Sequence, residues 1–172
     1  MIKNCILAFA LAVFIGGLTY GLNVYFKSEK GDFFILEKGK PVPDFAFETF
    51  DGASHSFADY KNQDVLIHFW ASWCAPCVVE FPDLVELAQS RPDISVLAIS
   101  SDRTEGAIQR FLDKHAPDLP ENFHIVYDRN GHLTRDKFSV FALPETFYVR
   151  KGGIFDSHII GAYADWERFS FE

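Results

Sequence analysis

Two cysteines three residues apart, Cys74 and Cys77, are the side chains in this sequence best suited to covalent chemistry. They lie in the run Trp73-Cys-Ala-Pro76-Cys. A Cys-x-x-Cys motif placed where a strand runs into a helix is typical of dithiols that form and open a disulfide. A thiolate at the first cysteine would attack a partner's disulfide, and the second cysteine would resolve the resulting mixed disulfide. The motif therefore predicts thiol–disulfide exchange.

The segments on either side of the pair predict the strand and the helix that this chemistry needs. Residues 65–71 form a continuous apolar run of strand length, and residues 75–90 place apolar side chains along one helical stripe. Cys74 should then lie at the helix N-terminus with its sulfur facing solvent, and Cys77 one turn further inside. Unpaired N–H groups and the helix dipole would lower the pKa of the Cys74 thiol from about 8.5 towards 7 or below. Cys74 is the predicted nucleophile, and Pro76 suits the first turn because its missing N–H costs nothing there.

Other uses of two cysteines at this spacing can be compared with the neighbouring residues. Covalent haem attachment needs a histidine directly after the second cysteine, and Val78 stands there. A zinc ribbon needs a second ligand pair, and the sequence has no other CxxC. A soft-metal site that recruits His68 or His115 stays open as an alternative, as does a purely structural pair.

The rest of the sequence predicts an α/β domain. Residues 45–60 contain two short alternating runs around Asp51-Gly52, which indicate a hairpin. The other expected elements are strands at 94–100, 124–128, 145–150 and 154–160, a helix from Thr104 to about His115, a short helix ending near Ser139 and a last short helix within 163–172. Alternating strands and helices followed by a terminal hairpin predict a mixed central sheet with helices on both faces.

The N-terminal segment predicts a membrane anchor. Residues 5–26 carry no charge, and 22 residues are enough for a helix, at about 1.5 Å per residue, to cross a hydrocarbon core of about 30 Å. A cleaved signal peptide is the alternative, but no small-residue cleavage site follows the apolar run. Lys3 before the span and the acidic body after it favour a cytoplasmic N-terminus and a domain on the outer or periplasmic side. We expect an anchor over 1–27, a tether over 28–40 and a folded domain over 41–172.

Composition narrows the range of partners. The chain has 172 residues with 24 acidic and 16 basic side chains; after position 27 the count is 24 acidic and 14 basic, a net charge of −10. Nucleic-acid binding needs a basic face, so no nucleic-acid partner is expected. At 48% hydrophobic content, the domain can bury a core without disulfide staples. The cysteines are therefore expected to have a chemical use, and no cofactor or metal is implied.

Two segments show a family resemblance. The run HFWASWCAPCVVEFP (68–82) and the run Leu-Pro-Glu-Thr-Phe (143–147), together with a hairpin between Gly153 and Gly161, resemble membrane-tethered thioredoxin-like proteins of the TlpA/ResA/DsbE group. This resemblance implies a thioredoxin-like fold with an N-terminal β-hairpin and a central insertion, and covers roughly residues 41–165. It also implies an extracytoplasmic oxidoreductase that reduces disulfides of apocytochrome c or a haem chaperone in cytochrome c maturation. An upstream electron donor in the membrane would keep the dithiol reduced.

The resemblance also implies roles for individual residues. Pro144 matches the family's cis-proline, which lies against the cysteine pair and leaves the preceding backbone free to pair with a substrate strand. Glu80 matches the acid three residues after the second cysteine, which could tune a thiol or relay a proton if burial raises its pKa. An exposed helix carboxylate is the alternative for Glu80. Glu145 matches the cytochrome c maturation branch, although a solvated strand glutamate would look the same.

Three further residues flank the pair. Trp73 is expected to shield the sulfur and to contact a partner, whereas Trp70 is expected in the core. His68 departs from the family, because it occupies the strand position where thioredoxins keep a buried acid. An imidazole there, with an unperturbed pKa near 6.5, could exchange protons with Cys77. A hydrogen-bonded core histidine is the alternative.

The leading hypothesis is thus an enzyme that reduces protein disulfides through Cys74 and Cys77. One alternative is a metal- or haem-handling chaperone in which the pair ligates instead of exchanging. Another is a general disulfide reductase that serves a different cofactor-assembly pathway. The direction of electron flow depends on the reduction potential, which the residues between the two cysteines do not reveal.

Overall fold

The computed structural model describes residues 16–17, 33–163 and 165–169 of the chain. The chain divides into two compact units, Met1–Asp32 and Phe33–Glu172, and the second unit holds the cysteine pair. The predicted anchor over 1–27 lies outside the described residues, apart from 16–17. Among the residues that are described, no helix is both long enough and apolar enough to span a bilayer.

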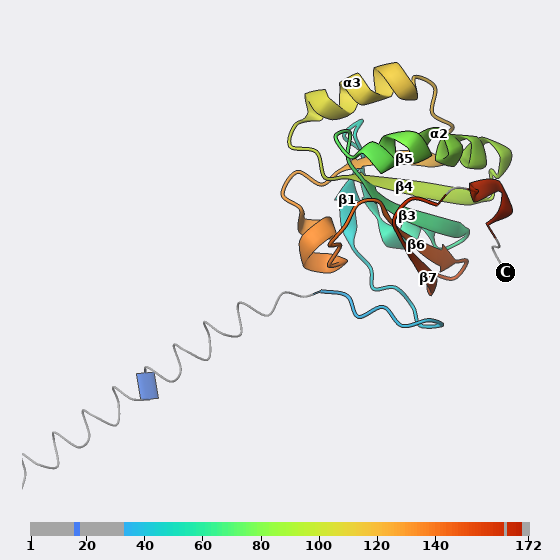
Figure 1. Ribbon diagram of the computed structural model, residues 1–172. Helices are drawn as coiled ribbons and strands as arrows, with labels where there is room; N and C mark the ends of the chain where they lie inside the picture. The colour runs from blue at the N-terminus through green and yellow to red at the C-terminus, as the bar shows by residue number, and fades with distance from the viewer. Residues whose placement is uncertain (1–15, 18–32, 164, 170–172) are drawn as a thin grey trace, which may run out of the picture. The chain divides into compact units, whose positions relative to one another are not determined.

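A five-stranded mixed sheet forms the centre of the domain (Figure 1), with the strand order β5-β4-β3-β6-β7. The parallel strands are β3 (Asp64–Trp70), β4 (Ile94–Ser100) and β5 (Phe123–Tyr127). The antiparallel strands are β6 (Glu145–Arg150), which pairs with β3, and β7 (Ile154–Ile160), which pairs with β6. All seven residues of β4 are buried, because a central strand covered on both faces has no solvent side. The predicted mixed sheet is confirmed.

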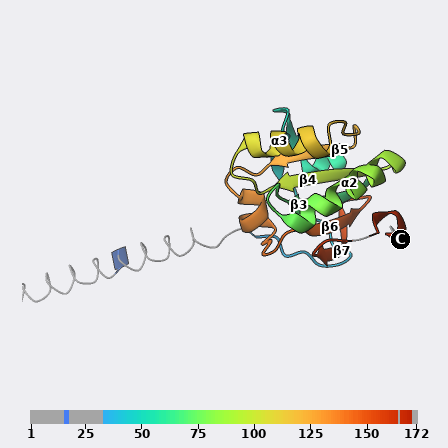
Figure 2. The same cartoon turned by 45° about the horizontal axis from the view of Figure 1, so that its top comes forward.

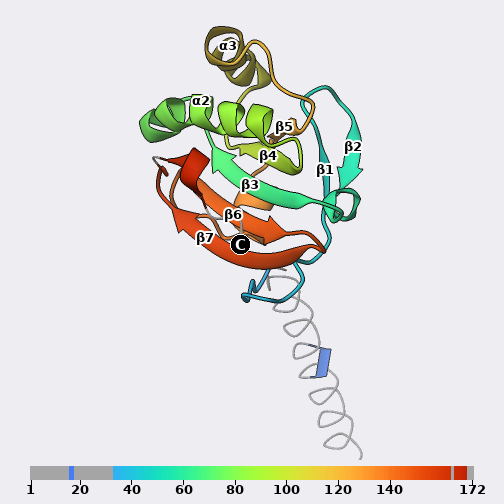
Figure 3. The same cartoon turned by 90° about the vertical axis from the view of Figure 1, so that its right-hand side faces the viewer.

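Within residues 33–163, both α-helices pack on one face of this sheet (Figure 2, Figure 3). They are α2 (Ala75–Ser90) and α3 (Glu105–His115), the latter in the crossover between β4 and β5. The Trp70 ring, which points to this face from β3, has its centroid 4.6 Å from that of Phe81 on α2 and 4.7 Å from that of Phe111 on α3. Helix α3, the helix expected from Thr104 to about His115, thus completes the core around Trp70.

The opposite face is covered by shorter elements. The predicted N-terminal hairpin is present as β1 (Ala46–Glu48) and β2 (Ser54–Ser56), and two single-turn helices, η1 (Phe57–Tyr60) and η2 (His132–Lys137), lie on the same side. The expectation of helices on both faces therefore holds here only for one-turn helices. On this face, the segment between β5 and β6 forms only the short helix η2 and is otherwise loop. Aromatic side chains fill the space instead, as in the contact of Phe138 with β3.

Residues 34–45, which precede β1, lie against the rest of the domain. The Phe34 amide donates to the Lys137 carbonyl over 2.6 Å, and the Phe34 ring contacts Phe138. The Gly39 amide donates to the Phe155 carbonyl over 2.8 Å. The segment predicted as a tether over 28–40 is thus bound to the domain from Phe34 onwards.

The C-terminal segment differs from its prediction. Among the described residues of 163–172, the only helical element is a single 3₁₀ turn, η3 (Trp166–Arg168), in place of the predicted last helix. Trp166 is 1% exposed and packs against Tyr163 and Phe169. Aromatic side chains inserted into the core hold this segment, so it needs no long helix to be stable.

Candidate active site

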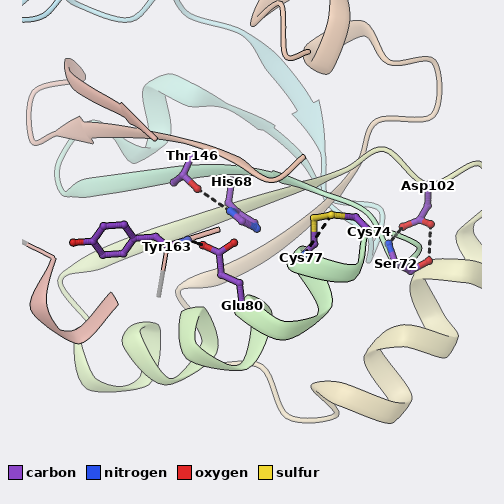
Figure 4. Close-up of a disulfide and its surroundings, with 8 residues drawn as sticks. All are labelled: His68, Ser72, Cys74, Cys77, Glu80, Asp102, Thr146 and Tyr163. Atoms are coloured by element: carbon purple, nitrogen blue, oxygen red, sulfur yellow. Dashed lines mark hydrogen bonds between the residues drawn. A yellow bond between two sulfur atoms is a disulfide. The ribbon is translucent and has the colours of Figure 1, made fainter. Parts of the chain in front are cut away.

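The cysteine pair lies where β3 ends and α2 begins (Figure 4), and it forms a disulfide with the two Cα atoms 5.2 Å apart. Cys74 is the N-cap residue of α2. Its Sγ accepts a hydrogen bond from the Cys77 amide over 3.3 Å, and its carbonyl accepts one from the Val78 amide. The sulfur thus takes the position of the oxygen in an ordinary N-cap. Pro76 lies in the first turn, as predicted, and the same N–H can stabilise a thiolate on Cys74 after reduction.

The two cysteines differ in accessibility. Cys74 is 6% exposed and Cys77 is fully buried. Cys74 lines a groove of about 650 Å³, which is the side from which a partner can reach its sulfur. Trp73 lines the same groove and is 67% exposed, so most of its ring stays accessible. Trp70 is buried in the core, as predicted.

The loop before β6 forms another part of the groove. The Leu143–Pro144 peptide bond is cis, in agreement with the family resemblance. Leu143 lines the groove together with Cys74. Pro144, the next residue in the sequence, is buried. The Pro144 carbonyl accepts a hydrogen bond from the Gly161 amide over 2.8 Å. The cis-proline loop and the start of α2 thus border one cavity.

Glu145 holds this loop in place. Its Oε1 accepts hydrogen bonds from the Phe141 amide over 3.1 Å and the Ala142 amide over 2.9 Å. Its Oε2 lies 2.7 Å from His158 Nε2, and the residue is fully buried. The alternative of a solvated strand glutamate is therefore wrong. Glu145 acts on the shape of the groove wall through the loop backbone.

Glu80 lies one helical turn after Cys77 and is 3% exposed, so the alternative of an exposed helix carboxylate is also wrong. Its Oε1 accepts hydrogen bonds from the Tyr163 amide over 3.1 Å and from Trp166 Nε1 over 2.8 Å. Burial raises the pKa of Glu80 to about 7, against the opposing effect of these two hydrogen bonds. Its Oε2 has no hydrogen-bond partner among the described residues. Glu80 can therefore hold or release a proton near neutral pH.

His68 faces α2 from β3. It is fully buried, and its Nδ1 lies 2.9 Å from Thr146 Oγ1 on the neighbouring strand. Burial lowers the pKa of His68 to about 3, which keeps the ring neutral at physiological pH. Its Nε2 has no hydrogen-bond partner within the described part of the chain, and the Glu80 carboxyl group points toward the ring (Figure 4). His68 thus matches the alternative of a hydrogen-bonded core histidine. Its proton exchange with Cys77 stays a prediction.

Asp102 fixes the turn that leads into Cys74. Its carboxylate accepts hydrogen bonds from the Ser72 amide over 2.9 Å and the Ser72 hydroxyl over 2.7 Å (Figure 4). It also accepts one from the Ser100 hydroxyl over 2.9 Å. Ser72 lies between β3 and α2, and Ser100 is the last residue of β4. The ends of two adjacent parallel strands are thus joined beside the disulfide.

Sequence reasoning missed several of these residues. The partners of Glu80 come from the C-terminal segment, and Thr146, His158 and Asp102 come from other strands or their ends. The one available signal was the concentration of aromatic residues at Tyr163 and Trp166, which favours burial. In the described ranges, no group of three or more His, Cys, Asp or Glu side chains is arranged to hold a metal ion.

A dithiol at a strand–helix junction, bordered by a cis-proline loop on a mixed sheet, defines the thioredoxin-like class of thiol-disulfide oxidoreductases. The chain belongs to the AhpC/TSA family, whose sequence profile matches residues 38–157. It is 32% identical to the thioredoxin-like protein YneN of Bacillus subtilis (strain 168), over 92% of this chain and 91% of that protein.

Two further relatives specify the group. The chain is 29% identical to the thiol-disulfide oxidoreductase ResA of Oceanobacillus iheyensis, over 77% of this chain and 70% of that protein. A crystal structure from Chlorobium tepidum, described as a thiol:disulfide interchange protein DsbE, superposes with a TM-score of 0.67 and 29% identity, over 77% of this chain and 92% of that one. The predicted TlpA/ResA/DsbE resemblance is confirmed, and the chain is a thiol-disulfide oxidoreductase of the ResA/DsbE type.

Proposed function

We propose that this protein reduces disulfides of a partner protein during cytochrome c biogenesis, on the outer side of the cytoplasmic membrane. The partner is an apocytochrome c or a haem chaperone, and the N-terminal segment 1–27 anchors the protein. An electron donor in the membrane returns the oxidised pair to the dithiol. The observation that carries the exchange chemistry is Cys74 Sγ at the N-cap of α2, where it accepts an N–H hydrogen bond and borders a groove.

The exchange proceeds in two displacements. The Cys74 thiolate attacks one sulfur of the partner disulfide, so that a mixed disulfide forms and the other partner sulfur leaves as a thiolate and takes up a proton. Cys77 then loses its proton and attacks Cys74 Sγ, which closes the Cys74–Cys77 disulfide and releases the second partner thiol. Two electrons and two protons pass from the protein to the partner. The order of attack follows from burial, because Cys77 is fully enclosed and Cys74 borders the groove.

Glu80 supports the second displacement. Cys77 must lose a proton in a buried position, and Glu80, with its pKa near 7, lies one turn further along α2. A carboxylate with a pKa near the working pH is suited to accept a proton. The ionised form can take the proton of Cys77, and the protonated form can return it in the opposite half of the cycle.

Trapping of the mixed disulfide tests this function. In cells that require the wild type, a Cys77→Ser variant should accumulate a thiol-sensitive adduct through Cys74, because the resolving thiol is missing. A Cys74→Ser variant is the matched control and should give no adduct. Identification of a cytochrome c or haem-chaperone partner in the adduct would support the proposal. Absence of any adduct, or equal adducts in both variants, would contradict it.

The location is tested separately. In intact cells, a membrane-impermeant maleimide should label the reduced wild-type protein at its cysteine pair if the domain lies outside. Labelling that requires disruption of the cells would place the domain in the cytoplasm and contradict the proposed location.

A further inference from the structure

The groove beside Cys74 is lined by several positively charged side chains, although the molecule as a whole is acidic. Its lining includes three arginines, Arg103, Arg129 and Arg135, although the part of the chain after position 27 is strongly acidic. We propose that the groove binds an acidic segment of the substrate polypeptide, so that disulfides flanked by Asp or Glu are reduced faster than others. This inference rests on the proposed function, because it names the kind of disulfide on which the dithiol acts.

The three arginines come from three separate segments that meet at one edge of the sheet. Arg103 follows β4, Arg129 follows β5, and Arg135 lies on η2. All three are exposed. Carboxyl ends of adjacent parallel strands meet at the same sheet edge, which is also where β3 delivers the cysteine pair. The fold therefore places these cations next to the reacting sulfur.

The acidic residues of the groove are bound to the protein itself. Asp102 is buried and accepts three hydrogen bonds from serine donors, as described above. Asp128 is buried and accepts hydrogen bonds from the Leu133 amide, the Thr134 amide and the Thr134 hydroxyl. These carboxylates offset part of the arginine charge, but their oxygens serve to hold the loops. The charged groups that the groove presents to a partner are thus the guanidinium groups.

The arginines keep donors for a ligand. Arg129 pairs with exposed Glu105, and Arg135 Nη2 donates to the Asn130 carbonyl. A guanidinium group has five N–H donors, so each of these contacts leaves several for a further acceptor. Carboxylates are the acceptors that match the geometry of a guanidinium group, through two parallel hydrogen bonds.

Exposed aromatic rings complete the surface. Trp73 and Phe141 also line the groove, and Phe141 is 76% exposed. A groove of about 650 Å³ with accessible aromatic rings and a few polar groups is typical of a ligand-binding site. Aromatic and arginine side chains are also enriched among the residues that contribute most of the binding energy at protein interfaces. The ligand that fits this combination is a polypeptide segment with apolar residues near its disulfide and carboxylates on either side.

Paired peptides test the inference. Two peptides with the same disulfide loop, one flanked by Glu and one by Lys, are offered to the reduced full-length protein, and the second-order rate constants of disulfide reduction are compared. The Glu peptide should react faster, and the ratio of the two rate constants should fall as salt is raised, because salt screens exposed charges. Each of the substitutions Arg103→Gln and Arg135→Gln should lower the ratio by about 1.5- to 5-fold, which is the effect expected for one exposed ion pair.

Arg110→Gln is the matched control, since Arg110 is exposed on α3 and does not line the groove. It removes the same charge and should leave the ratio of rate constants unchanged. Equal rates for the two peptides with the wild type, or a faster Lys peptide, would overturn the inference while leaving the proposed function intact. A second result would also overturn the inference: haem slows the reduction of both peptides, and the protein reduces the two peptides at equal rates. The anions that bind the groove would then be haem propionates. A wild type that reduces neither peptide would contradict the proposed function itself, and this inference with it.

Discussion

Replacement of Glu80 by Gln isolates the free-energy cost of one buried negative charge. The Oε1 of Glu80 accepts hydrogen bonds from the Tyr163 amide and from Trp166 Nε1. An amide oxygen in the same position can accept both, and the amide cannot ionise. The Glu80→Gln variant should therefore keep the packing of the C-terminal segment and lose only the titration.

The sign of the effect follows from the direction of the pKa shift. Burial raises the pKa of Glu80 from 4.5 to about 7, so the folded state binds this proton more tightly than the unfolded state does. The free energy of unfolding of the wild type must then fall as pH rises through this window and become level above it. At about 1.4 kcal/mol per pKa unit, the full shift corresponds to about 3 kcal/mol.

Equilibrium urea unfolding of the oxidised protein measures this difference, because a closed disulfide keeps both cysteines from titrating. Relative to the wild type, Glu80→Gln should gain about 2–3 kcal/mol between about pH 5 and about pH 8. Glu86→Gln, on the exposed face of the same helix, should show a change below about 0.5 kcal/mol. The wild type and Glu80→Gln could instead differ in unfolding free energy by the same amount at both pH values. That result would refute the claim that burial of the ionised carboxylate destabilises the fold.

Three further predictions concern the same surroundings. Trp166→Phe removes the Nε1 donor that lowers the pKa of Glu80, so the pH window of the wild-type stability loss should move upwards in the same unfolding assay. Burial lowers the pKa of His68 from 6.5 to about 3, so the free energy of unfolding of the wild type should fall on acidification below pH 6.5. Relative to His68→Asn, the wild type should lose about 1.4 kcal/mol of unfolding free energy per pH unit between about pH 6.5 and pH 4. Glu145→Ala leaves the Phe141 and Ala142 amides without their acceptor and should cost about 2–4 kcal/mol of unfolding free energy and slow disulfide reduction. The exposed control Glu48→Ala should change stability by less than about 0.5 kcal/mol, and equal losses for the two alanine variants would refute the role of Glu145.

The strand–helix junction could be predicted because its signals are local. An apolar run, a Cys-x-x-Cys motif and a helical stripe follow one another within a short stretch of sequence, and Cys74 does cap α2. The cis form of Pro144 could be predicted from family resemblance alone, since the sequence around a proline does not fix its isomer. The accessibility of Cys74 could not be predicted, because the loop that lines the groove with it comes from residues 140–143.

The surroundings of the two glutamates depended on contacts between distant parts of the chain. Trp166, the hydrogen-bond donor to Glu80, is 86 positions further along the chain. His158, which pairs with Glu145, lies on a different strand. Helical periodicity assigns Glu80 to a helix but does not reveal that a C-terminal segment covers it. The burial of both carboxylates, and with it their chemistry, was therefore visible only in the folded chain.

Selective alkylation of the reduced protein tests the central claim most directly. With a limiting amount of iodoacetamide near neutral pH, mass spectrometry of peptides should show Cys74 modified well before Cys77, and faster than a free cysteine in water, because Cys74 caps α2 and borders the groove while Cys77 is enclosed. Modification of Cys77 first, or of both cysteines only as fast as free cysteine, would contradict the assignment of Cys74 as the nucleophile.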